Sequence, residues 1–217
     1  MTKHLFNYCA IDWYEQELQD NGMDLHEMVQ KMGVDGIEQF IYSLDPVSNK
    51  YKDITVGVHL NYLPYWMDFW LKQAKRLKQQ FRNIRERNKY FKDAMSCDEW
   101  LSVIRRNIGA ALAQNPEYLV WHVAEANNEE AFTFEFNYSD REVLTAAADV
   151  FNAVCDEIPA HVPVLFENLW WPGLRLTDVR NVKYFFERLH HKNVGIMLDT
   201  GHLMNTNVRL QHEAEGA

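Results

Sequence analysis

The sequence has few cysteines, no long apolar run and no glycine-rich phosphate loop. Its three cysteines, Cys9, Cys97 and Cys155, are widely spaced and form no C-x-x-C pair, which argues against a disulfide framework or a thiolate zinc site. No run approaches the roughly eighteen apolar residues of a membrane span. The first residues also lack the basic and apolar stretches of a secretion signal. We therefore expect a cytoplasmic protein with no membrane partner.

Linkers, low-complexity tracts and internal repeats are missing as well. With 217 residues, of which 47% are hydrophobic, the chain is long enough to bury one substantial core. We therefore expect residues 1–217 to form a single domain.

Negative charges outnumber positive ones, 31 to 22, so the formal net charge is -9. This balance argues against nucleic acid as the main partner, since phosphate binding draws on clustered Lys and Arg. Residues 71–93 are the exception, because nine basic residues crowd a stretch that also has apolar residues near helical spacing. We favour a solvated amphipathic helix here, since charged outer faces are ordinary for surface helices and aromatic residues for base stacking are few. The nine are Lys72, Lys75, Arg76, Lys78, Arg82, Arg85, Arg87, Lys89 and Lys92.

Short apolar or β-branched runs alternate with helical patterns along the chain. The helical patterns begin at recognisable start signals, including Asp24 before residues 25–32 and Ser139 with Glu142 as a capping box. Strands that alternate with helices predict a parallel sheet in an α/β fold. The six predicted strands lie at residues 4–10, 36–42, 54–60, 118–124, 162–169 and 193–199.

Histidines and carboxylates recur where the last four predicted strands end. Because ligands gather at the carboxyl ends of parallel strands, we expect these side chains to lie close together. Each alone has a structural explanation, as a hydrogen-bonded histidine or a helix cap. Their joint placement favours a site for Zn²⁺, Mn²⁺, Co²⁺ or Mg²⁺, because carboxylate and imidazole without thiolate suit these ions. The residues are His59, His122, Glu167, Asp199 and His202.

Five segments of the sequence together resemble one known family. GVDGIEQF, GVHLNY, VWHVAEA, VLFENLWW and IMLDTGHLMN, in this order and spacing, resemble strands two to six of the xylose isomerase-like TIM barrels. This superfamily holds sugar phosphate isomerases and epimerases and the endonuclease IV-type apurinic endonucleases. The resemblance covers nearly the whole chain and implies a TIM-barrel-like (β/α) fold. Its most specific part is LDTGH, which follows the strand that contains the Glu-Asn pair of VLFENLWW.

The resemblance also implies roles for the candidate ligands. Glu167 on the fifth strand and Asp199 on the sixth would bind the metal, and Glu167 would also be the catalytic base. His202 would contact substrate or bind another metal. His59 and His122 match the histidines that hold additional metal in the endonuclease branch.

Substrate contacts are expected beside the metal. The resemblance places Glu38, on the second strand, so that it faces the site. Trp170 and Trp171 follow the fifth strand and could form apolar walls against sugar carbons, although filling the core would equally explain a Trp. The implied substrate is a small sugar or sugar phosphate. In a complete relative the chemistry would be proton transfer next to a carbonyl, through a metal-stabilised enediolate.

The family barrel has eight strands, with a metal-binding histidine on the seventh and a metal-binding, proton-transferring glutamate on the eighth. Only six strands are assigned in this sequence, and His212 and Glu213 follow His202 too closely to belong to the other two. We therefore expect a barrel that lacks two strands and has open sheet edges, covered by another copy of the chain or by another segment. Because two-base epimerisation would lack its second base, we expect little or no turnover by this chain alone.

Three functions stay open at this point. A metal-dependent sugar or sugar-phosphate isomerase or epimerase is favoured by the acidic charge and the motifs of the fifth and sixth strands. A metal-dependent phosphodiesterase that acts on abasic DNA is favoured by His59, His122 and the basic segment. A non-catalytic remnant is favoured by the missing strands.

Overall fold

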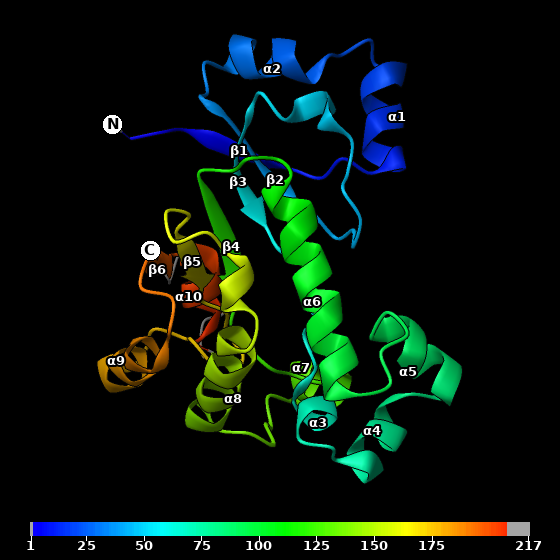
Figure 1. The fold of residues 1–217 in the computed structure, drawn as a ribbon, viewed down its shortest axis with the longest axis vertical. Helices are drawn as coiled ribbons and strands as arrows, with labels where there is room; N and C mark the ends of the chain where they lie inside the picture. Colours follow the sequence, from blue (N-terminus) through cyan, green and yellow to red (C-terminus); the bar gives the residue numbers. More distant parts are fainter. Residues whose placement is uncertain (1, 208–217) are drawn as a thin grey trace.

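A computed structural model describes residues 2–207. Within this range six strands form one parallel sheet in the order β1 to β6 (Figure 1). The fold class predicted from the sequence is therefore confirmed, and each strand lies within two residues of its predicted bounds at either end. The strands are β1 (Leu5–Tyr8), β2 (Gly36–Phe40), β3 (Thr55–His59), β4 (Tyr118–His122), β5 (Val164–Glu167) and β6 (Val194–Met197).

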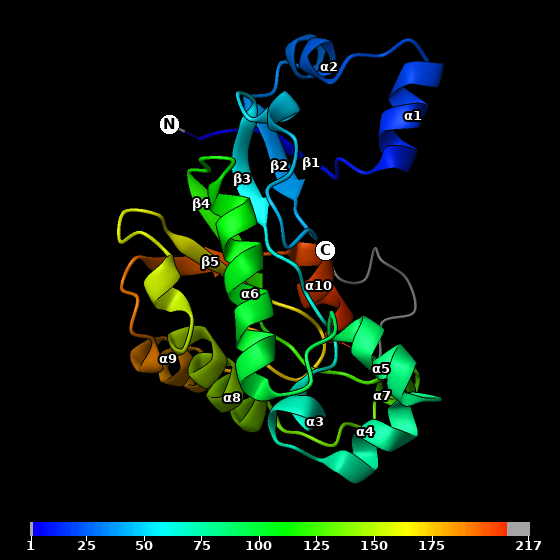
Figure 2. The same cartoon turned by 45° about the vertical axis from the view of Figure 1, so that its right-hand side comes forward.

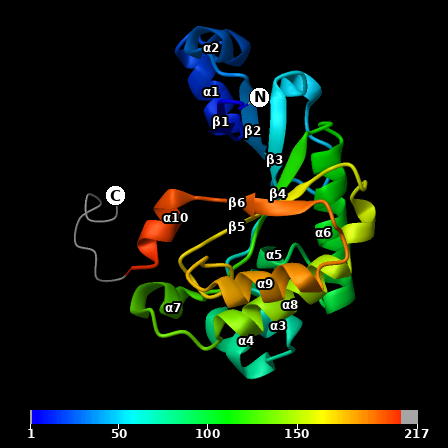
Figure 3. The same cartoon turned by 90° about the vertical axis from the view of Figure 1, so that its left-hand side faces the viewer.

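An α-helix follows every strand except β2, which a loop with a short 3-10 turn joins to β3. The helices are α1 (Asp12–Asp20), α2 (Leu25–Met32), α3 (Met67–Trp70), α4 (Ala74–Gln80), α5 (Ile84–Tyr90), α6 (Cys97–Leu112), α7 (Asn128–Thr133), α8 (Asp140–Asn152), α9 (Val179–Arg188) and α10 (Thr200–Asn205), with short 3-10 turns at Asn49–Tyr51 and Cys155–Glu157. The long helix α6 and the pair α8 and α9 lie along the outer face of the sheet (Figure 3). Helices α1 and α2 lie at one end of the molecule and α3 to α5 at the other (Figure 2).

The predicted helix start signals act as caps. The Asp24 side chain accepts a hydrogen bond from the Glu27 backbone N–H at the start of α2. Ser139 and Glu142 form the full capping box of α8, each side chain bonding to the other residue's backbone N–H. These bonds satisfy amide groups that have no partner inside the helix, which is why such residues mark helix starts.

The apolar core has a large and a small part. The large part joins the sheet to α6, α8 and α9, and its fully buried side chains include Leu119, Phe151, Phe166 and Phe185. The small part lies under α1 and α2 and includes Leu25 of α2 and Ile37 of β2. Side chains alternate between the two faces of a strand, so His122 and Glu167 lie on the inner face, opposite to Leu119 and Phe166.

The basic segment 71–93 differs from the prediction, because it forms two short helices, α4 and α5, instead of one. Phe81 between them is extended, with φ -112 and ψ 133, and its ring packs against the rings of Tyr90 and Phe91. The Asn83 side chain then caps α5 by accepting from the Glu86 N–H. Aromatic packing and a new cap thus interrupt the helical pattern. Seven of the nine basic side chains are exposed, as a solvated segment requires.

The outer strands of the sheet have one neighbour each within residues 2–207, because β1 pairs with β2 and β6 pairs with β5. A second copy of the chain that covers these edges stays a prediction. His212 and Glu213 lie outside the described residues. Within the described range, no helix has both the length and the apolar character that a membrane span requires.

Candidate metal centre

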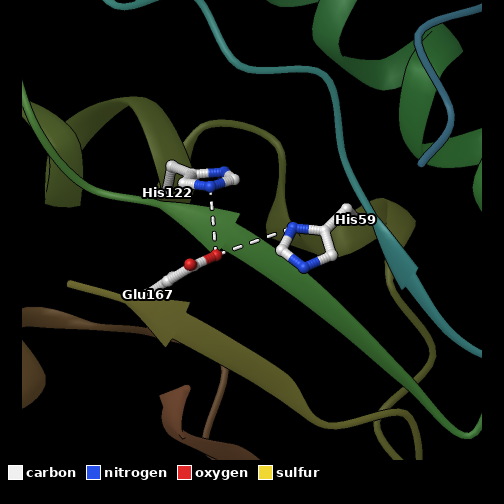
Figure 4. Close-up of side chains that lie close together, drawn as sticks. All are labelled: His59, His122 and Glu167. Carbon is white, nitrogen blue, oxygen red and sulfur yellow. Dashed lines mark ion pairs between the residues drawn. The ribbon is translucent and has the colours of Figure 1, made fainter. Parts of the chain in front are cut away.

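The parallel sheet brings the predicted ligands to one place. His59 ends β3, His122 ends β4 and Glu167 ends β5. In the register of the sheet, His122 pairs with Glu167 directly. Both histidine rings point toward the Glu167 carboxylate (Figure 4). The expected meeting of side chains at the carboxyl ends of the strands is therefore present.

Glu167 is the centre of this cluster, with 4% of its surface exposed. Its Oε2 atom lies 3.0 Å from His122 Nε2 and 3.6 Å from His59 Nδ1 (Figure 4). Its Oε1 atom faces the other way and lies 3.4 Å from His202 Nδ1. One buried carboxylate therefore faces a different set of imidazoles with each oxygen.

The first set, His59, His122 and Glu167, fits a divalent cation. Within residues 2–207, His59 Nδ1 and Glu167 Oε2 are buried without a hydrogen-bond partner, although such groups normally have one. One donor atom from each of the three residues lies within 4.8 Å of the others. Donor atoms around a tetrahedral zinc ion are about 3.3 Å apart, given zinc–ligand distances near 2.0 Å. The distances from Glu167 Oε2 to His122 Nε2 and His59 Nδ1, 3.0 and 3.6 Å, bracket that value, so the donor set suits a metal.

The second set consists of Glu167, Asp199 and His202. Asp199 is the N-cap of α10, where its Oδ1 accepts a hydrogen bond of 2.7 Å from the His202 N–H. Its Oδ2 lies 3.7 Å from His202 Nδ1. The side chain of Asp199 is 38% exposed, against 6% for Glu167. Asp199 therefore caps the helix with one oxygen and offers the other toward a site that is more open to solvent.

Asn168, which was not among the predicted site residues, holds this second set in place. Its Nδ2 donates to the Asp199 carbonyl and its Oδ1 accepts from the Asp199 N–H, both at 2.9 Å. Its own carbonyl lies 2.8 Å from His202 Nδ1. A neutral His202 that donates there keeps Nε2 as its free lone pair. The sequence signal for this role was the position of Asn168, an amide directly after Glu167 at the end of an apolar strand.

Replacement of Asn168 by Ala should weaken both the fold and the second donor set. Asn168 is fully buried, and the change leaves the N–H and carbonyl of the half-buried Asp199 without these partners, at a total cost of about 1–3 kcal/mol. We expect a lower melting temperature and a weaker metal affinity. Asn152→Ala is the matched control, because Asn152 makes the same pair of bonds to Arg188 and His190 away from the site. The control should lower the melting temperature alone.

Glu38 and Tyr118 lie next to the first donor set. Glu38 Oε1 is 2.6 Å from His59 Nε2, and Tyr118 Oη donates a hydrogen bond to Glu38 Oε2. Burial acts to raise the pKa of Glu38, but the hydrogen bonds from His59 and Tyr118 outweigh it and hold that pKa below its usual range. Burial, reinforced by Glu38, raises the pKa of Tyr118. Glu38 therefore faces the site as expected, while Tyr118 was missed.

Trp170 and Trp171 lie beside the second donor set. The ring centroid of Trp170 is 5.0 Å from that of His202 and 4.8 Å from that of Trp171. Within the described part of the chain, the Trp171 Nε1 atom is buried without a hydrogen-bond partner. These positions are consistent with a wall of the site, and contact with substrate stays a prediction.

Glu125 is a buried carboxyl group outside both donor sets. Its Oε2 accepts hydrogen bonds from the backbone N–H groups of Trp66, at 2.7 Å, and Met67, at 3.1 Å. Burial raises the pKa of Glu125 to about 8. The two bonds fasten the segment after β3 to the segment after β4. Tyr62 in the first segment stacks on the His122 ring, with centroids 4.8 Å apart, so this fastening supports the site from outside.

Comparison with known proteins places the chain in a family. The sequence profile of the xylose isomerase-like TIM barrels matches residues 27–215, so this chain belongs to the xylose isomerase-like TIM barrel family. The resemblance seen in the sequence is therefore confirmed. Comparison with curated protein sequences gives no match.

Solved structures of similar fold include two epimerase-type proteins and a nuclease. A D-tagatose 3-epimerase-like protein has 16% identity and a TM-score of 0.50, with 93% of this chain and 67% of that chain covered. The 3-keto-D-glucoside 4-epimerase YcjR from E. coli has 14% identity, a TM-score of 0.53 and coverage of 99% and 74%. Endonuclease IV from Thermus thermophilus has 11% identity, a TM-score of 0.50 and coverage of 94% and 65%. At these identities the likeness shows the fold alone.

Proposed function

We propose that this chain is a divalent-metal-dependent sugar or sugar-phosphate isomerase- or epimerase-like protein. The observation that carries the proposal is Glu167, a buried carboxylate with imidazoles on both sides and an atom that has no hydrogen-bond partner within residues 2–207. An isolated buried carboxylate is costly unless it is paired or binds a cation. A small sugar as substrate and a cytoplasmic location belong to the same proposal.

Glu167 and Asp199 are the first candidates to hold the cation, with His59, His122 and His202 completing the two donor sets. A bound Mn²⁺, Zn²⁺, Co²⁺ or Mg²⁺ supplies Lewis acidity, which stabilises negative charge on a substrate oxygen when the neighbouring carbon loses its proton.

Proton transfer and substrate contact are assigned to different side chains. Glu167 takes the proton from the carbon next to the carbonyl, because a carboxylate in the centre of the cluster can reach a substrate that is held there. Trp170 offers an apolar face beside His202, against which sugar carbons can pack. Its neighbour Trp171 extends this wall. Glu38, as a substrate contact, stays part of this proposal.

Deuterium exchange with solvent tests the proton transfer without requiring a second base. The metal-loaded chain is incubated in heavy water with a panel of keto sugars and their phosphates, and mass spectrometry follows the label. We expect deuterium to enter at the carbon next to the carbonyl, and Glu167→Gln to abolish the exchange. Asp199→Asn is the matched variant, because it weakens metal binding and keeps the base. Excess metal should therefore restore exchange in Asp199→Asn and leave Glu167→Gln inactive.

A second candidate function is cleavage of abasic DNA by a metal-dependent phosphodiesterase. It is favoured by the way His59 and His122 join Glu167 in a donor set separate from Asp199 and His202, since paired metal ions suit phosphodiester displacement. Cleavage of abasic-site DNA that is lost in His59→Ala and His122→Ala, without deuterium exchange into any sugar, would replace the first proposal. Metal binding with neither activity would favour a non-catalytic remnant.

A further inference from the structure

Three side chains form a hydrogen-bonded row on the inner face of the sheet. Tyr118 at the start of β4 donates to Glu38 on β2, and Glu38 in turn lies 2.6 Å from His59 Nε2 at the end of β3. His59 then presents Nδ1 toward Glu167 Oε2, 3.6 Å away. Glu38 and His59 are buried, with 6% and 4% of their surfaces exposed. The row therefore connects three strands and ends at the candidate metal centre.

Gly57 makes room for this row. Gly57 on β3 pairs with Tyr118 in the register of the sheet, and a Cβ atom at position 57 would lie 2.3 Å from the Tyr118 ring. No real Cβ contact is that short, so a side chain at this position would displace the ring. A glycine on the middle strand thus allows Tyr118 to reach across β3 and bond to Glu38 on β2.

The charges around His59 also point to a cation. Glu38 and Glu167 are both buried and both face the His59 ring. Among the described residues, the ion pairs of these two carboxylates are formed with histidines alone. A buried carboxylate needs a compensating charge. A divalent cation at His59 Nδ1 and Glu167 Oε2 would supply it, while Glu38 accepts a hydrogen bond from the N–H on the opposite nitrogen of the ring.

We propose that Glu38 and Tyr118 are positioning residues that fix His59 in the tautomer whose Nδ1 lone pair faces the metal. This inference rests on the proposed metal-dependent function. Metal-binding histidines usually donate their second N–H to a carboxylate, which sets the tautomer and the ring orientation. Glu38 has that geometry toward His59 Nε2. Tyr118 occupies the other carboxylate oxygen and thereby holds Glu38 in the required orientation.

Cobalt and zinc titrations of the whole chain test the positioning role. Loss of such a partner usually weakens metal binding about 10–100-fold, which we expect for Glu38→Ala. Glu38→Gln retains the shape and an acceptor, so it should fold well and weaken binding less. Tyr118→Phe should act in the same direction as Glu38→Gln. The visible absorption of bound Co²⁺ should also change in these variants, because the His59 ligand reorients, and a merely structural loss would leave that spectrum unaltered.

Two further variants sharpen the test. Tyr138→Phe is the matched control, since Tyr138 makes a comparable bond of 2.6 Å to the buried Asp68 away from the cluster, and it should leave metal affinity and the cobalt spectrum unchanged. Gly57→Ala should weaken metal binding by displacing Tyr118. In a Tyr118→Phe background, Gly57→Ala should bring no further loss of affinity, because the hydroxyl that it displaces is already gone.

The failure of this inference is distinct from the failure of the proposed function. A wild-type chain that binds neither Co²⁺ nor Zn²⁺ overturns both. A wild-type chain that binds metal, together with Glu38 and Tyr118 variants of equal affinity and unchanged cobalt spectrum, overturns the positioning role alone. Equal metal affinity in Glu38→Gln, with a higher sugar concentration needed for half-maximal deuterium exchange, would likewise overturn it and assign Glu38 to substrate binding.

Discussion

Purified chain should take up Zn²⁺ or Mn²⁺, and the double variant Glu167→Gln, Asp199→Asn should lose most of this binding. Glu167 belongs to both donor sets and Asp199 to one of them, so the pair removes an anionic ligand from each. Because carboxylate ligands carry the negative charge that attracts a dication, we expect the affinity to fall by about 100-fold or more. Isothermal titration calorimetry and metal analysis after dialysis measure the loss.

A charge-matched control distinguishes loss of the metal ligands from a general loss of negative charge. Glu187→Gln with Asp149→Asn removes two exposed carboxylates and should leave metal uptake unchanged. Metal should also raise the melting temperature of the wild type and not that of the site variant, since a ligand that binds only the folded chain stabilises it. Equal metal content in the wild type and the site variant would contradict the assignment of both donor sets.

Glu125→Gln should stabilise the protein at alkaline pH. Burial raises the pKa of Glu125 to about 8 from an ordinary value of 4.5, and the side chain is 3% exposed. The folded state therefore holds this proton more tightly than the unfolded state. Wild-type stability should fall as pH rises from the unfolded to the folded pKa, by about 1.4 kcal/mol per unit. Gln is neutral at every pH and its oxygen can still accept from Trp66 and Met67.

The pH window follows from these two pKa values. Below pH 4.5 the Glu125 side chain is protonated in both states, so it contributes no pH dependence there, and above about pH 8 the loss is complete. Between pH 6 and pH 9 the advantage of Glu125→Gln should grow by about 2–3 kcal/mol. Melting curves across this range measure it, and the exposed Glu187→Gln should follow the wild type. A constant difference between Glu125→Gln and wild type would show that Glu125 titrates normally.

Local patterns were sufficient for the strands and for the candidate ligands. The apolar runs that end at His59, His122 and Glu167 predicted both the parallel strands and the edge at which the side chains meet, because parallel strands all point their carboxyl ends the same way. Asp199 and His202 were predicted to lie at the end of the same strand, and the structure adds the helix cap that holds them together.

Contacts between segments that lie far apart in the sequence could not be predicted from these local patterns. The bond from Tyr118 to Glu38 spans 80 positions of sequence and exists because Gly57 leaves space between them. The bonds of Asn168 to Asp199 depend on the pairing of β5 with β6. The two helices of the basic segment depend on the packing of Phe81 against Tyr90. Nothing in the local sequence encodes these distances.

The sequence by itself thus determined the α/β class, the family resemblance and the five candidate ligands, because periodicity and the polar residues at strand ends are local properties of the chain. Only the tertiary structure decided how those ligands divide into two donor sets around Glu167 and which nitrogen of His59 faces Glu38. It also decided that the carboxyl group of Glu125 is buried. Each of these depends on strand register and on side chains that meet across the sheet, and register is set by packing of the whole domain.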